Sequence, residues 1–445
     1  MSLSDTEAIP TRDPIGFSDS GAGRFLAALF EVGTFLEIGA YRRAADGSGA
    51  LEGVVTGFGS VDGRPVFAFA QDDSDGRAAF TAAQGQKIAA LYRAARRAGA
   101  PIVGVFSGAG ARVSEGVDCL SAYGEVLAEA ASAKSRIPQI AVIAGPCGGA
   151  SAILAEEMDI TVLDRTKGET YLTPEVTEAD KKKPVSDLFV SGPEEAAEAV
   201  KKLLALLPTR AGDGTVCGEP RADADRPLPE GWSDEADPAK RLDAFDDEGA
   251  ALIFDREGGE PLFCALLRLN GRVIGAVASA PGCGEGRITA KAARRAARFL
   301  SFLGRFSIPV LTLVDAAGLT GNDVPAMAAL AEAYLSCRRK VTVLVGNAFG
   351  SAFLLLGSKA LGADYVFALD RAVIGALPPE TAVEFLLSDR LKEAEDPDAA
   401  RIALREEWLR TKASPLAAAR SGDIDDIVKE AELRQRVAAA FEILG

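Results

Sequence analysis

Two stretches of the sequence decide the fold: PQIAVIAGPCGGASA (138–152) and KVTVLVGNAFGSAF (340–353). Each is a run of apolar, strand-forming residues that enters a glycine loop and continues into a helix-forming segment. Gly145 corresponds to Gly346 and Gly149 to Gly350, with the same separation of 201 residues in both cases. This matched spacing indicates that one strand–loop–helix unit occurs twice in the chain.

The similarity extends outward from both loops in the same order. Upstream of each loop the pattern predicts a β-hairpin around Asp-Gly or Asn-Gly, then an Ala/Arg-rich helix, then a buried strand after a proline. The hairpins are VVTGFGSVDGRPVFAFAQD (54–72) and FCALLRLNGRVIGAVASAP (263–281), the helices QKIAALYRAARRAG (86–99) and TAKAARRAARFLSFLG (289–304), and the strands APIVGVF (100–106) and IPVLTLVD (308–315). This alternation predicts a duplicated α/β domain. The alternative, chance similarity between two unrelated α/β halves, would have to reproduce the whole order.

The composition along the chain predicts four segments. Residues 1–22 are polar and are expected to form a flexible N-terminal arm, and residues 23–207 form the first domain. Several prolines interrupt residues 208–239, which are expected to form the connection, and residues 240–445 form the second domain.

The overall composition excludes several classes of function. The 445 residues carry 49 Lys and Arg against 64 Asp and Glu, a formal charge of −15, so no bulk attraction for nucleic acid is expected. The chain contains no histidine, which excludes Ser-His-Asp catalysis and histidine-ligated metals, and we predict no metal site. Six scattered cysteines and the lack of an apolar run of ~18 residues favour a reduced, cytoplasmic protein without a membrane span.

The chemistry expected of the glycine loops is that of backbone donors. A strand that ends in glycines and opens a helix presents several N–H groups at the positive end of the helix dipole. Such a loop can bind a phosphate or serve as an oxyanion hole, although close packing of helix against strand would explain the glycines as well. The loops lack the GxxxxGK[ST] pattern of a P-loop.

At this point the sequence resembles a known family, the carboxyltransferase subunits of biotin-dependent acyl-CoA carboxylases (propionyl-CoA carboxylase β type) and related biotin-dependent decarboxylases. The resemblance rests on GVVTGFGSVDGRPVFAFAQD (53–72), AQGQKIAALYRAARRAGAPIVG (83–104), GARVSEGV (110–117), IPQIAVIAGPCGGA (137–150), NGRVIGAVA (270–278), AARFLSFLGRFSIPVLTLVD (296–315), RKVTVLVGNAFGSAFLLLGSK (339–359) and SPLAAARSGDIDDIV (414–428). It implies an α/β fold of two tandem crotonase-like (ClpP/crotonase) ββα-spiral domains.

The resemblance also implies an activity. Such an enzyme moves CO2 between carboxybiotin and the α-carbon of a short acyl-CoA, through enolates held by two backbone oxyanion holes. The N-terminal domain would bind the coenzyme A thioester, and the C-terminal domain would bind biotin carried on a separate protein. The implied partners are a biotin carboxyl carrier protein, a biotin carboxylase or a membrane decarboxylase subunit, and further copies of the chain in a hexamer.

The family motifs place the candidate site residues on this sequence. The implied catalytic positions, which supply backbone donors on the acyl and biotin sides, are Gly149, Ala150, Gly350, Ser351 and Ala352. The implied substrate-binding positions are Gly110, Ala111, Arg112, Gly148, Phe349, Phe353 and Leu354. Ala150 and Ser351 stand where the family has glycine. Two alternatives stay open: the α-subunit of a sodium-pump decarboxylase, which would use the same half-reaction, and a non-catalytic assembly subunit, which the loss of glycine at both loops would explain.

Two further features have structural interpretations. Cys147 lies in the first glycine loop, and we interpret it as a packing residue because the sequence offers no histidine to activate a thiolate. The cluster Arg93, Arg96 and Arg97 could contact phosphates of coenzyme A, but a solvated basic helix face is the favoured interpretation.

Overall fold

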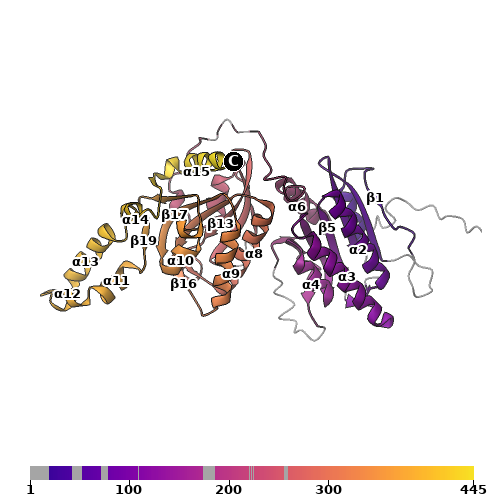
Figure 1. Ribbon diagram of the computed structural model, residues 1–445, viewed down its shortest axis with the longest axis horizontal. Coiled ribbons are helices and arrows are strands. Elements are labelled where there is room, and N and C mark those ends of the chain that lie inside the picture. Colours follow the sequence, from indigo (N-terminus) through magenta and orange to yellow (C-terminus); the bar gives the residue numbers. More distant parts are fainter. Residues whose placement is uncertain are drawn as a thin grey trace, which may run out of the picture. The chain divides into compact units, whose positions relative to one another are not determined.

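The chain folds into two compact units, residues 1–211 and 212–445, each built on an eight-stranded sheet (Figure 1). The computed structural model describes residues 20–42, 53–71, 79–108, 110–173, 186–219, 221, 223, 225–254 and 259–445. The predicted N-terminal arm therefore lies outside the described residues up to residue 19, and Gly21 and Ala22 already belong to the first helix, α1 (Gly21–Leu29). We call residues 1–211 unit 1 and residues 212–445 unit 2.

The two main sheets have the same strand order. In unit 1 the order is β1-β2-β3-β5-β7-β8-β10, with β9 paired to β7; in unit 2 it is β11-β12-β13-β15-β17-β18-β20, with β19 paired to β17. The strands of unit 1 are β1 (Leu36–Glu37), β2 (Val54–Val61), β3 (Arg64–Gln71), β4 (Ala79–Phe80), β5 (Ile102–Gly108), β6 (Gly110–Ala111), β7 (Gln139–Gly148), β8 (Ile160–Asp164), β9 (Glu169–Tyr171) and β10 (Leu188–Val190). Those of unit 2 are β11 (Leu252–Phe254), β12 (Leu262–Leu269), β13 (Arg272–Ser279), β14 (Arg287–Ile288), β15 (Val310–Ala316), β16 (Gly318–Leu319), β17 (Lys340–Phe349), β18 (Tyr365–Leu369), β19 (Val373–Gly375) and β20 (Asp426–Val428). The shared order confirms a duplicated α/β architecture.

Both predicted hairpins are present as antiparallel pairs, β2 with β3 and β12 with β13. The turn residues Asp62 and Gly63 have φ angles of 49° and 72°, and Asn270 and Gly271 have φ angles of 51° and 77°. Two successive positive φ angles define the type I′ turn, whose twist matches that of the flanking strands. After each hairpin the sheet continues by parallel pairing, β3 with β5 and β13 with β15.

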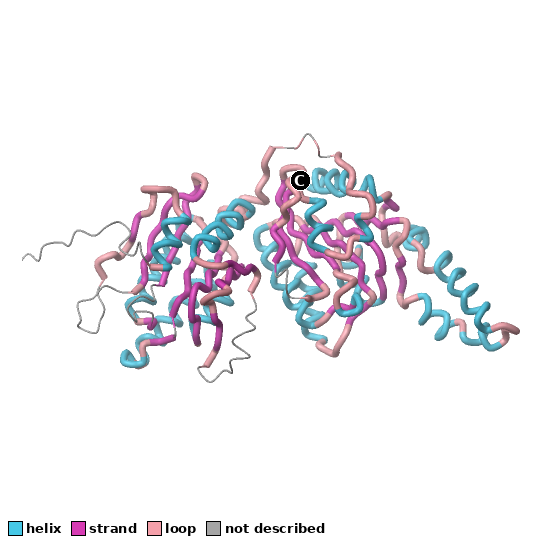
Figure 2. The backbone as a smooth tube through the Cα atoms, turned by 180° about the vertical axis from the view of Figure 1, so that it is seen from behind, coloured by secondary structure: helices cyan, strands magenta, loops and turns pink. Residues whose placement is uncertain are grey.

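The helices repeat as well (Figure 2). Thr81 caps α2 and Thr289 caps α8, each accepting a hydrogen bond from the backbone N–H three residues later. Helix α2 packs against α3, and α8 packs against α9 in the same way. The helices of unit 1 are α1, α2 (Ala82–Ala98), α3 (Val117–Ala133), α4 (Ala150–Glu157) and α6 (Pro193–Leu206), with a short turn η2 (Val113–Glu115). Those of unit 2 are η3 (Trp232–Asp234), α7 (Pro238–Phe245), η4 (Gly284–Gly286), α8 (Ala290–Phe306), α9 (Val324–Ser336), α10 (Gly350–Leu355), η5 (Lys359–Leu361), α11 (Pro379–Leu386), α12 (Ser388–Lys392), α13 (Pro397–Thr411), α14 (Pro415–Ser421) and α15 (Glu430–Leu444).

Each unit has its own hydrophobic core. In unit 1, Phe69 and Phe106 from the sheet meet Tyr92 from α2, and all three side chains are fully buried. In unit 2, Phe245 from α7 and Phe441 from α15 are buried against the sheet. A smaller cluster holds α11, α12 and α13 together, and these helices extend away from the sheet of unit 2 (Figure 1).

The predicted connection, 208–239, contains the boundary between the units and packs largely against unit 2. Leu228 and Trp232 are buried in the core of that unit, and the Trp232 ring donates a hydrogen bond to the carbonyl of Arg241 (3.0 Å). The prolines therefore break regular structure without producing a solvated linker, because the apolar side chains between them bury surface.

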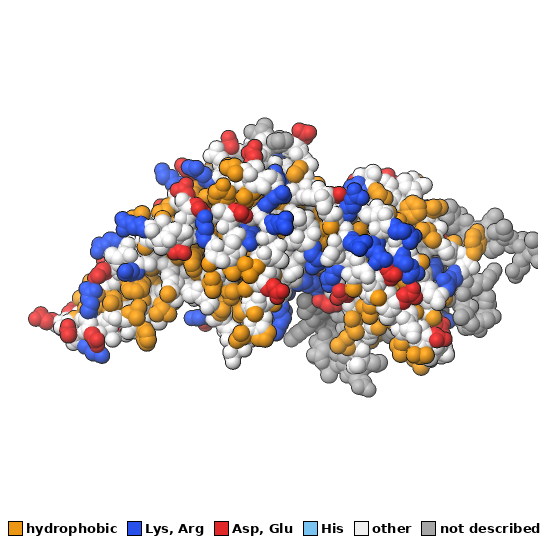
Figure 3. Space-filling model, in the orientation of Figure 1, with side chains coloured by type: hydrophobic (Ala, Val, Ile, Leu, Met, Phe, Trp, Pro, Cys, Tyr) orange, Lys and Arg blue, Asp and Glu red, His pale blue; other side chains and the backbone are white. Residues whose placement is uncertain are grey.

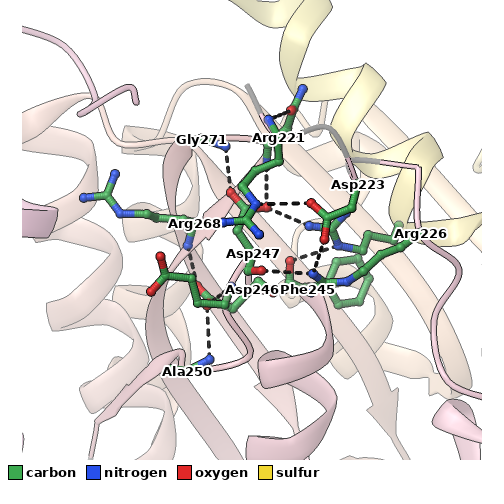
Figure 4. Close-up of polar contacts among 12 residues, drawn as sticks. Arg221, Asp223, Arg226, Phe245, Asp246, Asp247, Ala250, Arg268 and Gly271 are labelled. Carbon is green, nitrogen blue, oxygen red and sulfur yellow. Dashed lines mark hydrogen bonds and ion pairs between the residues drawn. The ribbon is translucent and has the colours of Figure 1, made fainter. Parts of the chain in front are cut away.

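A buried polar cluster fixes this segment and the C-terminal helix to the sheet (Figure 4). The Asp247 carboxylate accepts hydrogen bonds from the backbone N–H of Gly271 (2.7 Å) and from the guanidinium of Arg434 on α15 (2.7 Å). Arg226, from the connection, donates to the carbonyl of Asp247 (2.9 Å). The side chains of Asp247 and Arg434 are almost completely buried, so this pair is satisfied inside the protein and has no access for a substrate.

Candidate active site

Each of the two glycine loops has a positive-φ glycine where the strand passes into the helix. Strand β7 leads through Gly149 into α4, and strand β17 leads into Gly350 at the start of α10. Gly149 has a φ of 59° and Gly350 a φ of 54°, a conformation that residues other than glycine adopt only with strain. Ala150 and Ser351 have no positive φ, so their Cβ atoms do not strain the loops. The departures from the family pattern therefore fall at positions where the backbone tolerates a side chain.

The first glycine of each loop is required for a different reason, which is close packing. A Cβ on Gly145 would lie 2.3 Å from the hydroxyl oxygen of Ser107, and a Cβ on Gly346 would lie 2.5 Å from the carboxylate of Asp315. Ser107 is the second-last residue of β5 and Asp315 that of β15, so the two residues occupy equivalent places, 208 positions apart. Neither residue was identified from the sequence as part of the site. The only signal there was their shared position at the end of matching strands.

The structure changes the assignment of donors in unit 1. The N–H of Gly149 donates to the carbonyl of Tyr171 in β9 (2.9 Å), so it closes the loop and is not directed at a ligand. Ala150 and Ser151 are the first two residues of α4, and their N–H groups have no acceptor within the helix. The Ser151 hydroxyl is buried against the Tyr123 hydroxyl (2.6 Å), which fixes this first turn. The donors that α4 offers are therefore those of Ala150 and Ser151.

The loop of unit 2 is held by a carboxylate. Asp315 accepts a hydrogen bond from the N–H of Asn347 (2.9 Å), and the buried guanidinium of Arg241 lies 4.0 Å from its second oxygen. Burial lowers the pKa of Arg241 from its usual value, while Asp315 opposes that shift. The chain then continues from Asn347 into the first turn of α10, which is formed by Gly350, Ser351 and Ala352. Ser351 is exposed and Ala352 is buried.

The motif GARVSEGV places β6 next to the loop of unit 1. Gly110 has a φ of 122°, Gly110 and Ala111 pair with β4, and β6 contacts α4. The N–H of Arg112 donates to the carbonyl of Phe80 (2.8 Å), and its side chain is half-buried. Glu115 accepts a hydrogen bond from the N–H of Ala82 (2.7 Å), so it caps α2. This stretch thus brings a second backbone segment next to α4.

The remaining candidates divide between core and surface. Gly148 and Phe349 are buried at the ends of β7 and β17, Phe353 is half-buried, and the Leu354 side chain is 44% exposed. Leu354 is therefore the one of these four residues that presents an apolar side chain to solvent.

Cys147 is a packing residue, as predicted, whereas Arg93 and Arg96 form ion pairs with α3 in place of the solvated basic face expected from the sequence. Burial raises the pKa of the Cys147 thiol to about 12, so it stays protonated at neutral pH. Arg93 pairs with Glu125 and Glu129, and Arg96 pairs with Glu129. Lys and Arg side chains (blue) gather over the part of unit 1 that carries α2 (Figure 3). The bonds of Arg93 and Arg96 to glutamates of α3 make these two arginines part of the helix packing.

Membrane spans and metal clusters are both missing from the described ranges. No helix there is both long enough and apolar enough to cross a membrane. Within the same ranges, no group of three or more Cys, Asp or Glu side chains is arranged to hold a metal ion.

The chain is similar to characterised proteins over nearly its whole length. The family model described as "Carboxyl transferase domain" matches residues 25–444. The propionyl-CoA carboxylase carboxyltransferase subunit of Haloferax mediterranei is 31% identical, covering 94% of this chain and 88% of that protein. The methylmalonyl-CoA decarboxylase α-subunit of Propionigenium modestum is 29% identical, covering 94% and 89%. Among solved structures, transcarboxylase 12S, a hexamer with methylmalonyl-coenzyme A bound, matches with a TM-score of 0.87 at 28% identity, covering 95% and 88%.

Proposed function

Since this chain belongs to the carboxyl transferase domain family, we propose that it moves a carboxyl group between biotin on a carrier protein and the α-carbon of a short acyl-CoA. It is a biotin-dependent acyl-CoA carboxyltransferase of two crotonase-like halves. The observation that carries the proposed mechanism is the matched pair of loops, each of which ends at a helix N-terminus with a positive-φ glycine. A reaction with two enolate-like states needs two such sites.

On the acyl side, the N–H groups of Ala150 and Ser151 would hold the thioester oxygen. When the α-carbon loses a proton or a carboxyl group, negative charge develops on that oxygen. A preorganised donor is worth roughly 2.7–4 kcal/mol at that moment, because the protein dipole needs no reorganisation. Gly149 supplies the turn, and its bond to Tyr171 keeps the first turn of α4 in place.

On the biotin side, the first turn of α10 would supply backbone donors to the ureido oxygen of biotin, on which negative charge develops during the transfer. Biotin, when bound, carries the transferred carboxyl group on its ureido ring. The residues at that turn, Gly350, Ser351 and Ala352, are small and contribute backbone donors, and a Cβ on Gly350 would already lie 3.3 Å from the carbonyl of Ala376. Asp315 accepts a hydrogen bond from the N–H of Asn347, three residues before Gly350, and so positions this turn.

The chain supplies neither a histidine nor a thiolate as a general base at these loops. It contains no histidine, and Cys147 is protonated at neutral pH. The protein's contribution is therefore to bind, orient and stabilise charge with backbone groups.

We further propose that the active form is a homo-oligomer, most simply a hexamer, and that a biotin carboxyl carrier protein delivers the biotin to unit 2. The hexameric state of transcarboxylase 12S supports the first point, and the requirement for biotin supports the second. Multi-angle light scattering of the full chain tests the oligomer; a monomer at the concentration used in an activity assay would contradict it.

The direct test is turnover of methylmalonyl-CoA by the full chain in the presence of free biotin or a biotinylated carrier domain. We expect propionyl-CoA to form, detected by chromatography, only when biotin is present. The similarity to a decarboxylase subunit supports a second candidate function, in which the enzyme removes a carboxyl group from the acyl-CoA in the cell instead of adding one. The biotin-dependent half-reaction is the same for both functions. An enzymatic role would be contradicted if methylmalonyl-CoA binds but is not turned over with free biotin or with the biotinylated carrier domain.

A further inference from the structure

Arg241 on α7 is a buried cation beside the loop of unit 2. Its side chain is 5% exposed, and its guanidinium lies 4.0 Å from the carboxylate of Asp315. Two other nitrogens of the guanidinium donate to backbone carbonyls, one to that of Glu235 (2.7 Å) and one to that of Ser233 (2.8 Å). Burial of a guanidinium costs free energy unless a carboxylate balances its charge, and Asp315 supplies that balance.

Asp315 connects this cation to the loop that precedes α10. One carboxylate oxygen accepts a hydrogen bond from the N–H of Asn347 (2.9 Å), and the other faces Arg241. The carboxylate also lies against the backbone of Gly346, where a Cβ would come within 2.5 Å of it. Three residues after Asn347, the chain enters α10 at Gly350. The position of this carboxylate therefore sets where the first turn of α10 begins.

The duplicated half places the corresponding arginine differently. The N-cap residues of α1 and α7 are Ser20 and Asp237. Counted from these caps, Arg24 on α1 corresponds to Arg241 on α7. The side chain of Arg24 is 50% exposed, and its guanidinium lies 3.4 Å from the carboxylate of Glu194 on α6. The arginine of unit 1 is thus a surface residue, whereas that of unit 2 is turned into the protein.

The side chain that packs against the loop differs in the same way. In unit 1 the counterpart of Asp315 is the neutral Ser107, whose hydroxyl oxygen would lie 2.3 Å from a Cβ on Gly145. In unit 2 a charged carboxylate fills the corresponding place beside Gly346. The unit whose loop is fixed by a charged side chain is therefore the unit that buries its arginine, which links the charge of Arg241 to the loop.

We propose that Arg241 is a positioning residue for the biotin-side donors, because its charge holds the Asp315 carboxylate in the place from which it binds Asn347. This role rests on the proposed function, which assigns biotin to the first turn of α10. It belongs to the charge of the arginine, since 4.0 Å is too long for a hydrogen bond between the two groups. Without that charge, the carboxylate, whose side chain is 13% exposed, would be free to turn toward water.

The first measurement is the KM of each substrate in the biotin-dependent turnover of methylmalonyl-CoA by the full chain. Arg241→Met removes the charge and should raise KM for free biotin by about tenfold, the effect of losing one hydrogen bond to a charged group. KM for methylmalonyl-CoA should change by less than about twofold, because the acyl-side donors belong to unit 1. Arg241→Lys keeps the charge and should leave both constants within about threefold of the unaltered values.

Arg434→Met is the matched control, since it also takes a buried arginine of unit 2 away from a carboxylate. The partner of Arg434, Asp247, binds Gly271 just before β13 begins. Asn347 lies near the end of β17, which runs parallel to β13 through β15, so the control pair is at the other end of the strands. Its loss should lower stability without raising KM for biotin. An arginine that acted only through stability would give this same result in Arg241→Met, and that result would overturn the proposal.

Hydrogen exchange measured by mass spectrometry tests the same role without turnover. The peptide that contains Asn347 should exchange about tenfold faster in Arg241→Met than in the unaltered protein, because its N–H loses a positioned acceptor. Arg434→Met should leave this peptide unchanged. Equal exchange in Arg241→Met and the unaltered protein would contradict the positioning role, and so would a parallel rise in both KM values. If the unaltered protein shows no turnover at all, the proposed function fails, and hydrogen exchange alone decides whether Arg241 positions the loop.

Discussion

Gly145→Ala perturbs the acyl-side loop at the point where the structure leaves no room. The new Cβ would lie 2.3 Å from the Ser107 hydroxyl oxygen, 3.2 Å from its Cβ and 3.5 Å from its Cα. Ser107 is buried at the end of β5, so its short side chain cannot move into solvent and the loop must shift. Overpacking of this kind costs about 1–3 kcal/mol. A displacement of about 1 Å at a positioned donor lowers turnover roughly 10²-fold.

The assay combines urea unfolding with biotin-dependent turnover of methylmalonyl-CoA. Gly124→Ala is the matched control, since its Cβ would enter open space on α3 and remove a helical glycine. This control should raise the free energy of unfolding by roughly 0.5–1 kcal/mol and leave turnover unchanged. Ser107→Gly removes the colliding atoms, so Gly145→Ala/Ser107→Gly should recover much of the turnover. The role given to this contact is refuted if Gly145→Ala alone is as stable and active as the unaltered protein, or if Ser107→Gly gives no recovery.

The other predictions concern the thiol and the buried ion pair. Cys147→Ala should retain turnover within about threefold. The rate of the unaltered protein should show no dependence on thiol ionisation between pH 6 and 9, because burial raises the pKa of this thiol to about 12. An inactive Cys147→Ala variant would mean that the thiolate takes part in the reaction. Arg434→Met should lower the free energy of unfolding by about 3–5 kcal/mol, since it leaves the buried Asp247 carboxylate without its ion-pair partner. Urea denaturation measures this, and a loss below about 1 kcal/mol would show that backbone donors alone satisfy Asp247.

Much of the fold could be predicted because its signals are local. Asp-Gly and Asn-Gly specify type I′ turns within a few residues, and the observed positive φ angles at Asp62 and Asn270 bear this out. Thr81 and Thr289 are caps that can be found from the helices that follow them. The duplication is predicted from sequence because the hairpin, helix, strand and glycine-loop signals recur in the same order at nearly constant spacing.

The details of the site depend on contacts that a local pattern does not contain. The donor role predicted for Gly149 changes because β9, which follows only after α4 and β8, returns to pair with β7, and its residue Tyr171 accepts the N–H of Gly149. Likewise, Ser107 and Asp315 meet their glycines across neighbouring parallel strands. Strand pairing of this kind is set by the tertiary fold.

The predicted connection contains the boundary between the units, but residues of its second half pack into unit 2. Its prolines and acidic residues are typical of a linker, but Leu228 and Trp232 bury their side chains in unit 2. Arg226 adds hydrogen bonds to the backbone at the end of α7. An apolar residue in such a segment is buried only where the tertiary fold places an apolar surface beside it, and the composition of the segment does not contain that information.

In the proposed mechanism, backbone N–H groups at the start of α4 stabilise the charge of the acyl enolate. The substitution Ala150→Pro removes one of these groups, and proline at the first helical position is otherwise well tolerated. Ala150→Gly keeps the N–H and serves as the control. We expect Ala150→Pro to turn over methylmalonyl-CoA about 10²–10³-fold more slowly than Ala150→Gly, while both unfold at similar urea concentrations. Equal turnover of the two folded variants would contradict the claim.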